Sequence, residues 1–143
     1  MRKALLDVSF LLATFDANHV SHSAARTWLE ANIAHGWSSC AITENGFVRI
    51  VSQPRYPNRL SPEAAIAKLA EARSSQHHTF RACDLSVADS ARIDRQRILG
   101  PNVVTDAYLL ALAVRHDDRL VTLDQRISTT SVAGATNEHL VVV

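Results

Sequence analysis

Residues 103–124, VVTDAYLLALAVRHDDRLVTLD, contain signals for a helix, a turn and a strand in direct succession. Residues 104–115 are apolar almost all round, which is typical of a helix buried in a core. Asp117-Asp118 predicts a turn, and residues 119–123 predict a buried strand that stops at Asp124. A buried helix followed at once by a buried strand is characteristic of an α/β fold.

Strand and helix signals alternate through the rest of the chain. Further strands are predicted over residues 4–6, 37–42, 77–83 and 139–143. Further helices are predicted over residues 8–15, 21–34, 44–51, 61–74 and 86–97. We expect Thr43 to cap the third of these, Ser61 with Pro62 to begin the fourth, and Ser86 with Asp89 to begin the fifth. The alternation predicts the α/β class, with a mostly parallel sheet and helices on both of its faces.

The chain has 143 residues, of which 47% are apolar and 20% are charged. That length and balance predict one globular domain over residues 1–143 and exclude a disordered chain. The net charge of +1 excludes a uniformly basic, histone-like mode of nucleic-acid binding. No stretch approaches a membrane span of about 20 apolar residues. Cys40 and Cys83 have no metal-ligand spacing, so we expect two buried free thiols and a reducing, cytoplasmic location.

Four acidic residues occupy positions that indicate a common metal-binding site. Asp7 and Asp124 directly follow predicted strands, while Glu44 and Asp106 lie in the first turns of predicted helices. In a right-handed βαβ arrangement, these positions all face the carboxyl edge of one sheet. Carboxylates gathered there would repel one another, and a hard divalent cation such as Mg²⁺ or Mn²⁺ would relieve the repulsion. Taken singly, each acid is more typical of a turn residue or a helix-dipole partner than of a functional site.

A phosphotransfer enzyme is a rival interpretation, because receiver domains and haloacid-dehalogenase-like phosphatases also place Asp at strand ends. Both families rely on a lysine in the later part of the fold, and no lysine follows Lys68 here. Ser9 also stands where the phosphatases need a second Asp. These departures disfavour phosphotransfer.

Four segments, LLDVSFLLATF, ITENGFVRIVSQPRYPN, VTDAYLLALAV and LVTLDQRI, resemble in order and spacing the motifs of PIN-domain ribonucleases. The resemblance is strongest to the VapC-type toxins of VapBC toxin–antitoxin pairs. It implies a PIN-like three-layer α/β/α sandwich and a Mg²⁺- or Mn²⁺-dependent endoribonuclease acting on structured RNA, whether tRNA, rRNA or mRNA. It also implies a homodimer, and a cognate VapB-type antitoxin that blocks the site within a heterotetramer or larger assembly.

The resemblance assigns the four acids of the family to Asp7, Glu44, Asp106 and Asp124. We expect Asp7 and Asp106 to ligate metal directly, with Glu44 and Asp124 acting through water or on a second ion. The family usually has Asn two residues after the first acid, where this chain has Ser9. A serine hydroxyl can still hydrogen-bond a ligand or a metal-bound water.

RNA binding requires basic side chains near the acids. Arg49, Arg55 and Arg59, with Tyr56 available to stack on a base, follow Glu44 with no intervening acid, and we favour them for this role. A second cluster, residues 92–97, has three arginines diluted by Asp94. Two alternatives remain open: a PIN nuclease of RNA maturation, and a catalytically silent PIN-like module that binds RNA or a partner. Retention of all four acids favours the enzyme.

Overall fold

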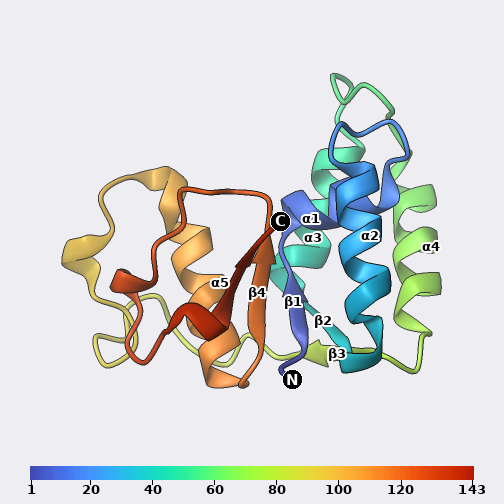
Figure 1. Cartoon of the computed structure of the whole chain (residues 1–143). Coiled ribbons are helices and arrows are strands. Elements are labelled where there is room, and N and C mark those ends of the chain that lie inside the picture. Colours follow the sequence, from blue (N-terminus) through green and yellow to red (C-terminus); the bar gives the residue numbers. More distant parts are fainter.

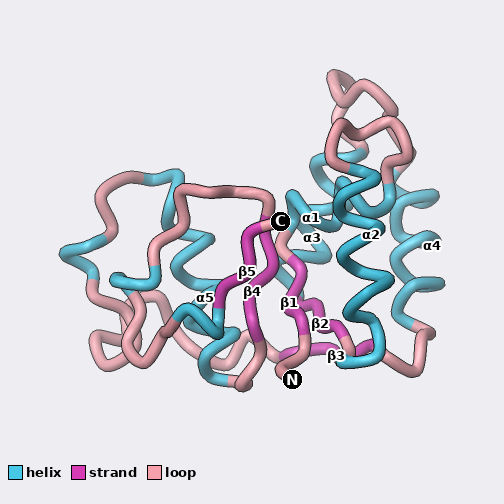
Figure 2. The backbone as a smooth tube through the Cα atoms, viewed as in Figure 1, coloured by secondary structure: helices cyan, strands magenta, loops and turns pink.

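A five-stranded sheet forms the centre of the computed structural model, which describes residues 1–143. The strands are β1 (Ala4–Leu6), β2 (Trp37–Cys40), β3 (His78–Arg81), β4 (Arg119–Thr122) and β5 (Leu140–Val142). Their order is β3-β2-β1-β4-β5, and every neighbouring pair is parallel. Figure 2 shows these strands between the flanking helices. Because all five strands run the same way, their carboxyl ends lie at one edge of the sheet.

Five α-helices accompany the sheet. They are α1 (Val8–Phe15), α2 (His22–Asn32), α3 (Ala41–Val51), α4 (Pro62–Arg73) and α5 (Val104–Arg115). Five short 3₁₀ helices are η1 (Ile33–His35), η2 (Arg95–Arg97), η3 (Pro101–Val103), η4 (Thr129–Ser131) and η5 (Asn137–His139). In Figure 1, α1 to α4 are gathered on one side of the central strands and α5 on the other. None of the helices is both long enough and apolar enough to span a membrane.

The two cores follow from the alternation of side chains along β1. Ala4 and Leu6 belong to a cluster that includes buried residues of α1, α2, α3 and α4. Leu5, between them, points the other way and joins Leu120 and the buried residues of α5. Successive side chains of a strand lie on opposite faces, so one three-residue strand contributes to both cores. The predicted α/β/α layering is confirmed.

Local signals set most of the helix boundaries. The Asp7 carboxylate caps α1 by accepting a hydrogen bond of 2.8 Å from the Phe10 amide. Ser61 caps α4 in the same way through the Ala64 amide at 3.1 Å, with Pro62 at the first helical position. Gly36 ends η1 with a φ of 86°, a value that glycine adopts without steric cost. The predicted bounds of α5 are confirmed at both ends.

Three local predictions are wrong. Thr43 does not cap α3: the helix begins at Ala41, and the Thr43 hydroxyl accepts a hydrogen bond from the Cys40 amide from within the first turn. No α-helix forms over residues 86–97, where turns lead to the short η2. Cys40 is buried as expected, but Cys83 is exposed.

A buried ion pair stabilises the start of β4. Asp118, which is 1% exposed, accepts two hydrogen bonds from the Arg81 guanidinium at 2.7 and 2.9 Å. The Ser38 hydroxyl donates a third at 2.8 Å. These contacts connect β2, β3 and β4 across the sheet.

Candidate active site

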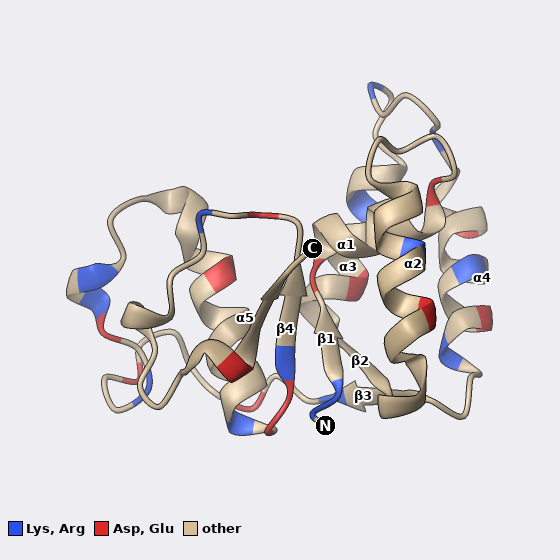
Figure 3. Cartoon of the chain, in the orientation of Figure 1, with Lys and Arg blue, Asp and Glu red and all other residues tan.

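The four acids occupy the predicted positions in the fold. Asp7 follows β1 and Asp124 lies two residues beyond β4, while Glu44 and Asp106 lie in the first turns of α3 and α5. Acidic positions are drawn in red in Figure 3, which shows red at the upper end of β1, on α3 beside it, and on α5. Each acid therefore comes from a different element.

Asp7 is the most deeply buried of the four, at 5% exposed. Its Oδ1 accepts hydrogen bonds of 2.8 Å from the Phe10 amide and from the Ser9 hydroxyl. Burial raises the pKa of Asp7, while hydrogen bonds from Thr122, Phe10 and Ser9 oppose that rise. The nearby charge of Asp124 raises the pKa further. The Asp7 carboxylate is thus fixed in position, while burial and the charge of Asp124 disfavour its ionised form.

Ser9 connects Asp7 with the end of β4. Its hydroxyl donates a hydrogen bond to Asp7 and accepts one from the Leu123 amide at 3.4 Å. The expectation that a hydroxyl at this position can contact the first acid therefore agrees with the geometry. The Thr122 hydroxyl, beside it, accepts from the Asp124 amide at 3.0 Å.

Asp106 is half-buried at the start of α5 and makes no side-chain hydrogen bond or close ion pair. Burial and the charges of Asp7 and Asp124 raise its pKa to about 6, while the charge of Arg126 opposes the rise. The three aspartates are therefore close enough for each to influence the ionisation of another. A cation placed among them would favour the charged forms.

Asp124 has a cationic partner of its own. Arg126 donates to both of its oxygens, through Nε at 3.0 Å and Nη2 at 2.9 Å. These hydrogen bonds, with one from the Arg126 amide, lower the pKa of Asp124. The Arg126 side chain is 77% exposed, so this pair is weak and can open at little cost.

Glu44 makes different contacts from the three aspartates. It accepts a hydrogen bond of 2.6 Å from the Ser39 hydroxyl and lies 3.5 Å from Arg73 Nε. It is not among the charges that shift the pKa of Asp7 or Asp106. Glu44 thus begins a second polar group beside the aspartates, and this division was not predicted.

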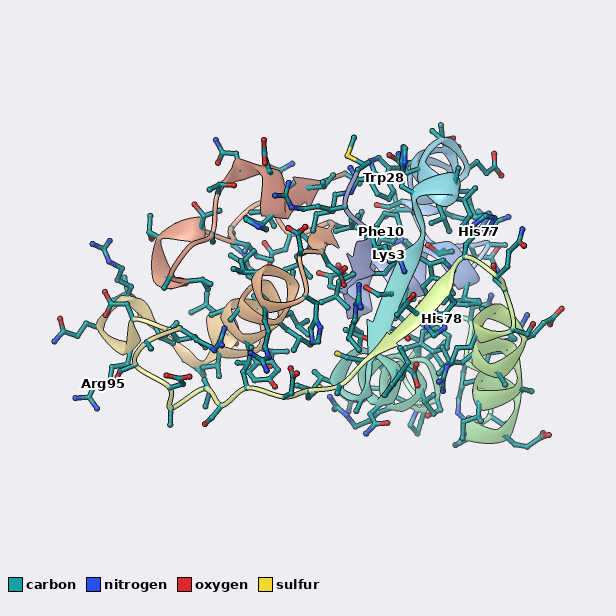
Figure 4. All side chains as sticks on the ribbon, turned by 90° about the horizontal axis from the view of Figure 1, so that it is seen from below. Lys3, Phe10, Trp28, His77, His78 and Arg95 are labelled. Atoms are coloured by element: carbon teal, nitrogen blue, oxygen red, sulfur yellow. The ribbon has the colours of Figure 1, made fainter.

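His78 completes this second group from β3, beside α3 and α4 in Figure 4. Its Nε2 lies 2.8 Å from the Ser39 hydroxyl. The hydroxyl has one proton, and the short bond to Glu44 uses it, so Ser39 accepts from His78 Nε2–H. Burial lowers the pKa of His78 to about 4, with a contribution from Arg73. Parallel pairing of β2 with β3 brings Ser39 and His78 together, although they lie far apart in the sequence.

The favoured RNA-binding residues lie on and after α3. Arg49 lines a groove with Glu44 between α3 and α4, and Arg55 is exposed in the loop that follows α3. Arg59 is exposed and donates through Nε to the Ser52 carbonyl at 3.0 Å. Tyr56 is half-buried, and its hydroxyl donates to Asp16 at 2.7 Å. That loop extends beyond the ends of the helices in Figure 1.

The fit of a divalent metal depends on which carboxylates are uncommitted. No three acidic, histidine or cysteine side chains are arranged so that they could hold an ion together. Asp7 and Asp106 are the two site carboxylates that make no direct ion pair, since Arg126 pairs with Asp124 and Arg73 with Glu44. Mg²⁺ characteristically binds through one or two carboxylates and keeps several waters. Asp7 and Asp106 fit that mode.

The parallel sheet, with acids at its carboxyl edge, is the arrangement expected for a PIN domain, and comparison with known sequences supports this assignment. The PIN domain family model matches residues 4–132, so the chain belongs to the PIN-domain family. Within it, the chain is of the VapC type. It is 56% identical to Ribonuclease VapC44 of Mycobacterium tuberculosis over 138 residues, covering 96% of this chain and 97% of the relative. It is 39% identical to Ribonuclease VapC39 of the same organism over 132 residues, covering 92% and 95% respectively.

Proposed function

We propose that the chain is a divalent-metal-dependent endoribonuclease toxin that hydrolyses phosphodiester bonds in structured RNA. One observation carries the proposal: Asp7 and Asp106, without direct ion pairs, share the acid edge of a chain 56% identical to a protein named as a ribonuclease. The pKa values of Asp7 and Asp106 are both raised, and a bound divalent cation would lower them by stabilising the ionised carboxylates. The class of substrate is tRNA, rRNA or mRNA.

In this proposal Asp7 and Asp106 hold Mg²⁺ or Mn²⁺. The ion would supply a water of lowered pKa and neutralise charge on the phosphate. Ser9 and the Phe10 amide fix Asp7 at one oxygen, so its orientation is set before any ligand arrives. Glu44 and Asp124 complete the site through water or hold a second ion. Arg126 is exposed beside Asp124, and its guanidinium can release that carboxylate and bind a phosphate oxygen of the RNA instead.

The VapC type of the relatives also supports a VapB-type antitoxin as partner. We propose a cytoplasmic site of action. We propose a homodimer that assembles with antitoxin into a heterotetramer or larger complex. Copurification of the chain with its antitoxin, followed by light scattering, measures that stoichiometry. A toxin role predicts growth arrest on expression of the chain, relieved by the antitoxin, whereas a nuclease of RNA maturation predicts neither.

The direct test is cleavage of total RNA by purified, antitoxin-free protein with Mg²⁺, with Mn²⁺ and with EDTA. We expect discrete fragments that disappear in EDTA and in Asp7→Asn or Asp106→Asn. Asp89→Asn, at an acid that pairs with Arg92 and contacts none of the four site acids, is the matched control and should cleave normally. Retained RNA binding without cleavage in either metal would instead support the silent binding module.

A further inference from the structure

A cavity of about 380 Å³ lies directly beside the acid site. It is enclosed by η2, η3, the first turn of α5 and the segment after β4, and we call it the η3 pocket (residues 96–99, 103, 106–107, 126–128 and 130–131). Asp106 and Arg126 line it and also belong to the acid site. A group that enters the η3 pocket is therefore adjacent to the reacting position.

Five of the twelve residues that line the η3 pocket are aliphatic. Ile98 and Ile127 line it while packing against the core around α5, so this part of the wall is fixed by the fold. Val103 adds to the same wall. Leu99 also lines the pocket, and its side chain is 89% exposed and free to contact a ligand. The pocket thus offers apolar surface that the fold itself does not cover.

Polar groups on the pocket complement this apolar surface. Gln96 provides an amide that can both donate and accept, and Ser128 and Thr130 provide hydroxyls. Arg97 and Arg126 are cations on the same lining. Arg95, in the same short helix as Arg97, projects away from the fold in Figure 4 and extends the basic surface outward. A ligand with flat apolar faces, polar edges and a neighbouring anion matches this combination.

We propose that the η3 pocket receives an unpaired nucleobase next to the scissile phosphate of the RNA. The inference rests on the proposed nuclease function and specifies its substrate as an unstacked, single-stranded position. The volume is within the range of about 300–1,000 Å³ typical of small-ligand pockets. Extruded bases are held between apolar side chains and recognised by hydrogen bonds at their edges. The neighbouring phosphate would lie beside Arg126, which belongs both to the pocket lining and to the acid site.

The test uses an RNA stem-loop with one 2-aminopurine in the loop, titrated with protein in EDTA so that binding is measured without cleavage. The wild-type chain should change the fluorescence of the base on binding. Leu99→Ser should weaken binding by about tenfold, the factor expected for loss of one apolar contact. Val20→Ser is the matched control, because Val20 is also an exposed apolar residue, at 96%, but lies between α1 and α2. Equal binding by Leu99→Ser and wild type would overturn the proposal.

A second measurement separates the base pocket from a contact between copies of the chain. Sedimentation of Leu99→Ser should show the same association state as wild type, and a shift to monomer would overturn the proposal in favour of an interface. With active protein and metal, Leu99→Ser should also lose preference for the nucleotide beside the cut. Failure of the nuclease proposal would appear differently, as absent cleavage with the fluorescence change and its Leu99 dependence intact.

Discussion

The Ser39 hydroxyl donates a hydrogen bond of 2.6 Å to Glu44 and thereby connects β2 to the first turn of α3. Arg73 contacts the same carboxylate from α4. Glu44 is therefore held in place by residues outside the aspartate group. This relationship makes Ser39 a positioning residue for Glu44.

Ser39→Ala should lower the cleavage rate because Glu44 loses its shortest contact. If Ser39 acts through Glu44, Ser39→Ala and Glu44→Gln should not be additive in the double variant. Single-turnover cleavage rates of the three variants measure the coupling. Ser38→Ala is the matched control, since Ser38 is also buried but bonds Asp118. Independent, additive effects of Ser39 and Glu44 would contradict the role.

His78 should remain neutral, with its proton on Nε2, throughout the range from pH 5 to 8. Its pKa is lowered to about 4, and Ser39 requires a donor from it. In the unfolded chain, the imidazole takes up a second proton, and with it a positive charge, near the ordinary pKa of about 6.5. Stability is therefore lost as the pH falls from that value toward 4. Imidazole ¹⁵N shifts report the tautomer and the midpoint, and a midpoint near 6.5 would contradict the prediction.

Asp106→Asn should stabilise the metal-free protein at pH 7.5. The folded state keeps the Asp106 proton up to a pKa of about 6, against 3.8 as the ordinary value, so Asp106 reduces stability as the pH rises between them. The full shift corresponds to about 3 kcal/mol, and solvent screening at this half-exposed site reduces the expected gain to about 1 kcal/mol. Melting in EDTA should show an increase of about 4 °C in the midpoint.

The gain from Asp106→Asn should shrink as the pH is lowered through 6, because the wild-type carboxyl then becomes neutral. Added Mg²⁺ should reverse the order, since wild type gains stability from the ion and the variant has lost a ligand. Asp89→Asn should show neither effect. A gain that does not vary with pH would refute the electrostatic explanation.

Asp118→Ala should be among the most destabilising single changes, because it leaves the Arg81 guanidinium and the Ser38 hydroxyl without their partner. Breaking a buried ion pair in this way costs about 3–5 kcal/mol. Urea denaturation followed by circular dichroism measures the loss. Glu138→Ala, which removes an exposed partner of Arg2, should leave the urea midpoint unchanged. A similar midpoint for both variants would contradict the assigned importance of Asp118.

Much of the fold could be predicted because its signals are local. The apolar run of α5, the strand that ends before Asp7 and the Ser61-Pro62 helix start each depend on a few adjacent residues. The positions of Asp7 and Asp106 followed from the same signals. Residues 86–97 misled the prediction because Ser86 and Asp89 bond amides two residues ahead and form turns instead of a helix start.

The group around Glu44 could not be predicted, because it depends on how strands pair. His78 reaches Ser39 only after β2 and β3 align in parallel, with Ser38 beside Thr79. Nothing in either segment specifies that alignment by itself. The pairing of Arg126 with Asp124 is local, but choosing it over the many other exposed arginines required the geometry of the turn after β4.

The central position of β1 also has a consequence for biosynthesis. Ala4 of β1 pairs with Trp37 of β2 on one side and with Arg119 of β4 on the other. The pairing of β1 with β4 can form only after the chain through β4 has been translated. Contacts this distant in the sequence form late and slow the folding of a chain. Asp7 cannot meet Asp106 and Asp124 until the chain has been translated beyond residue 124 and β4 has paired with β1. A nascent chain that stops short of β4 therefore lacks the assembled group of three aspartates.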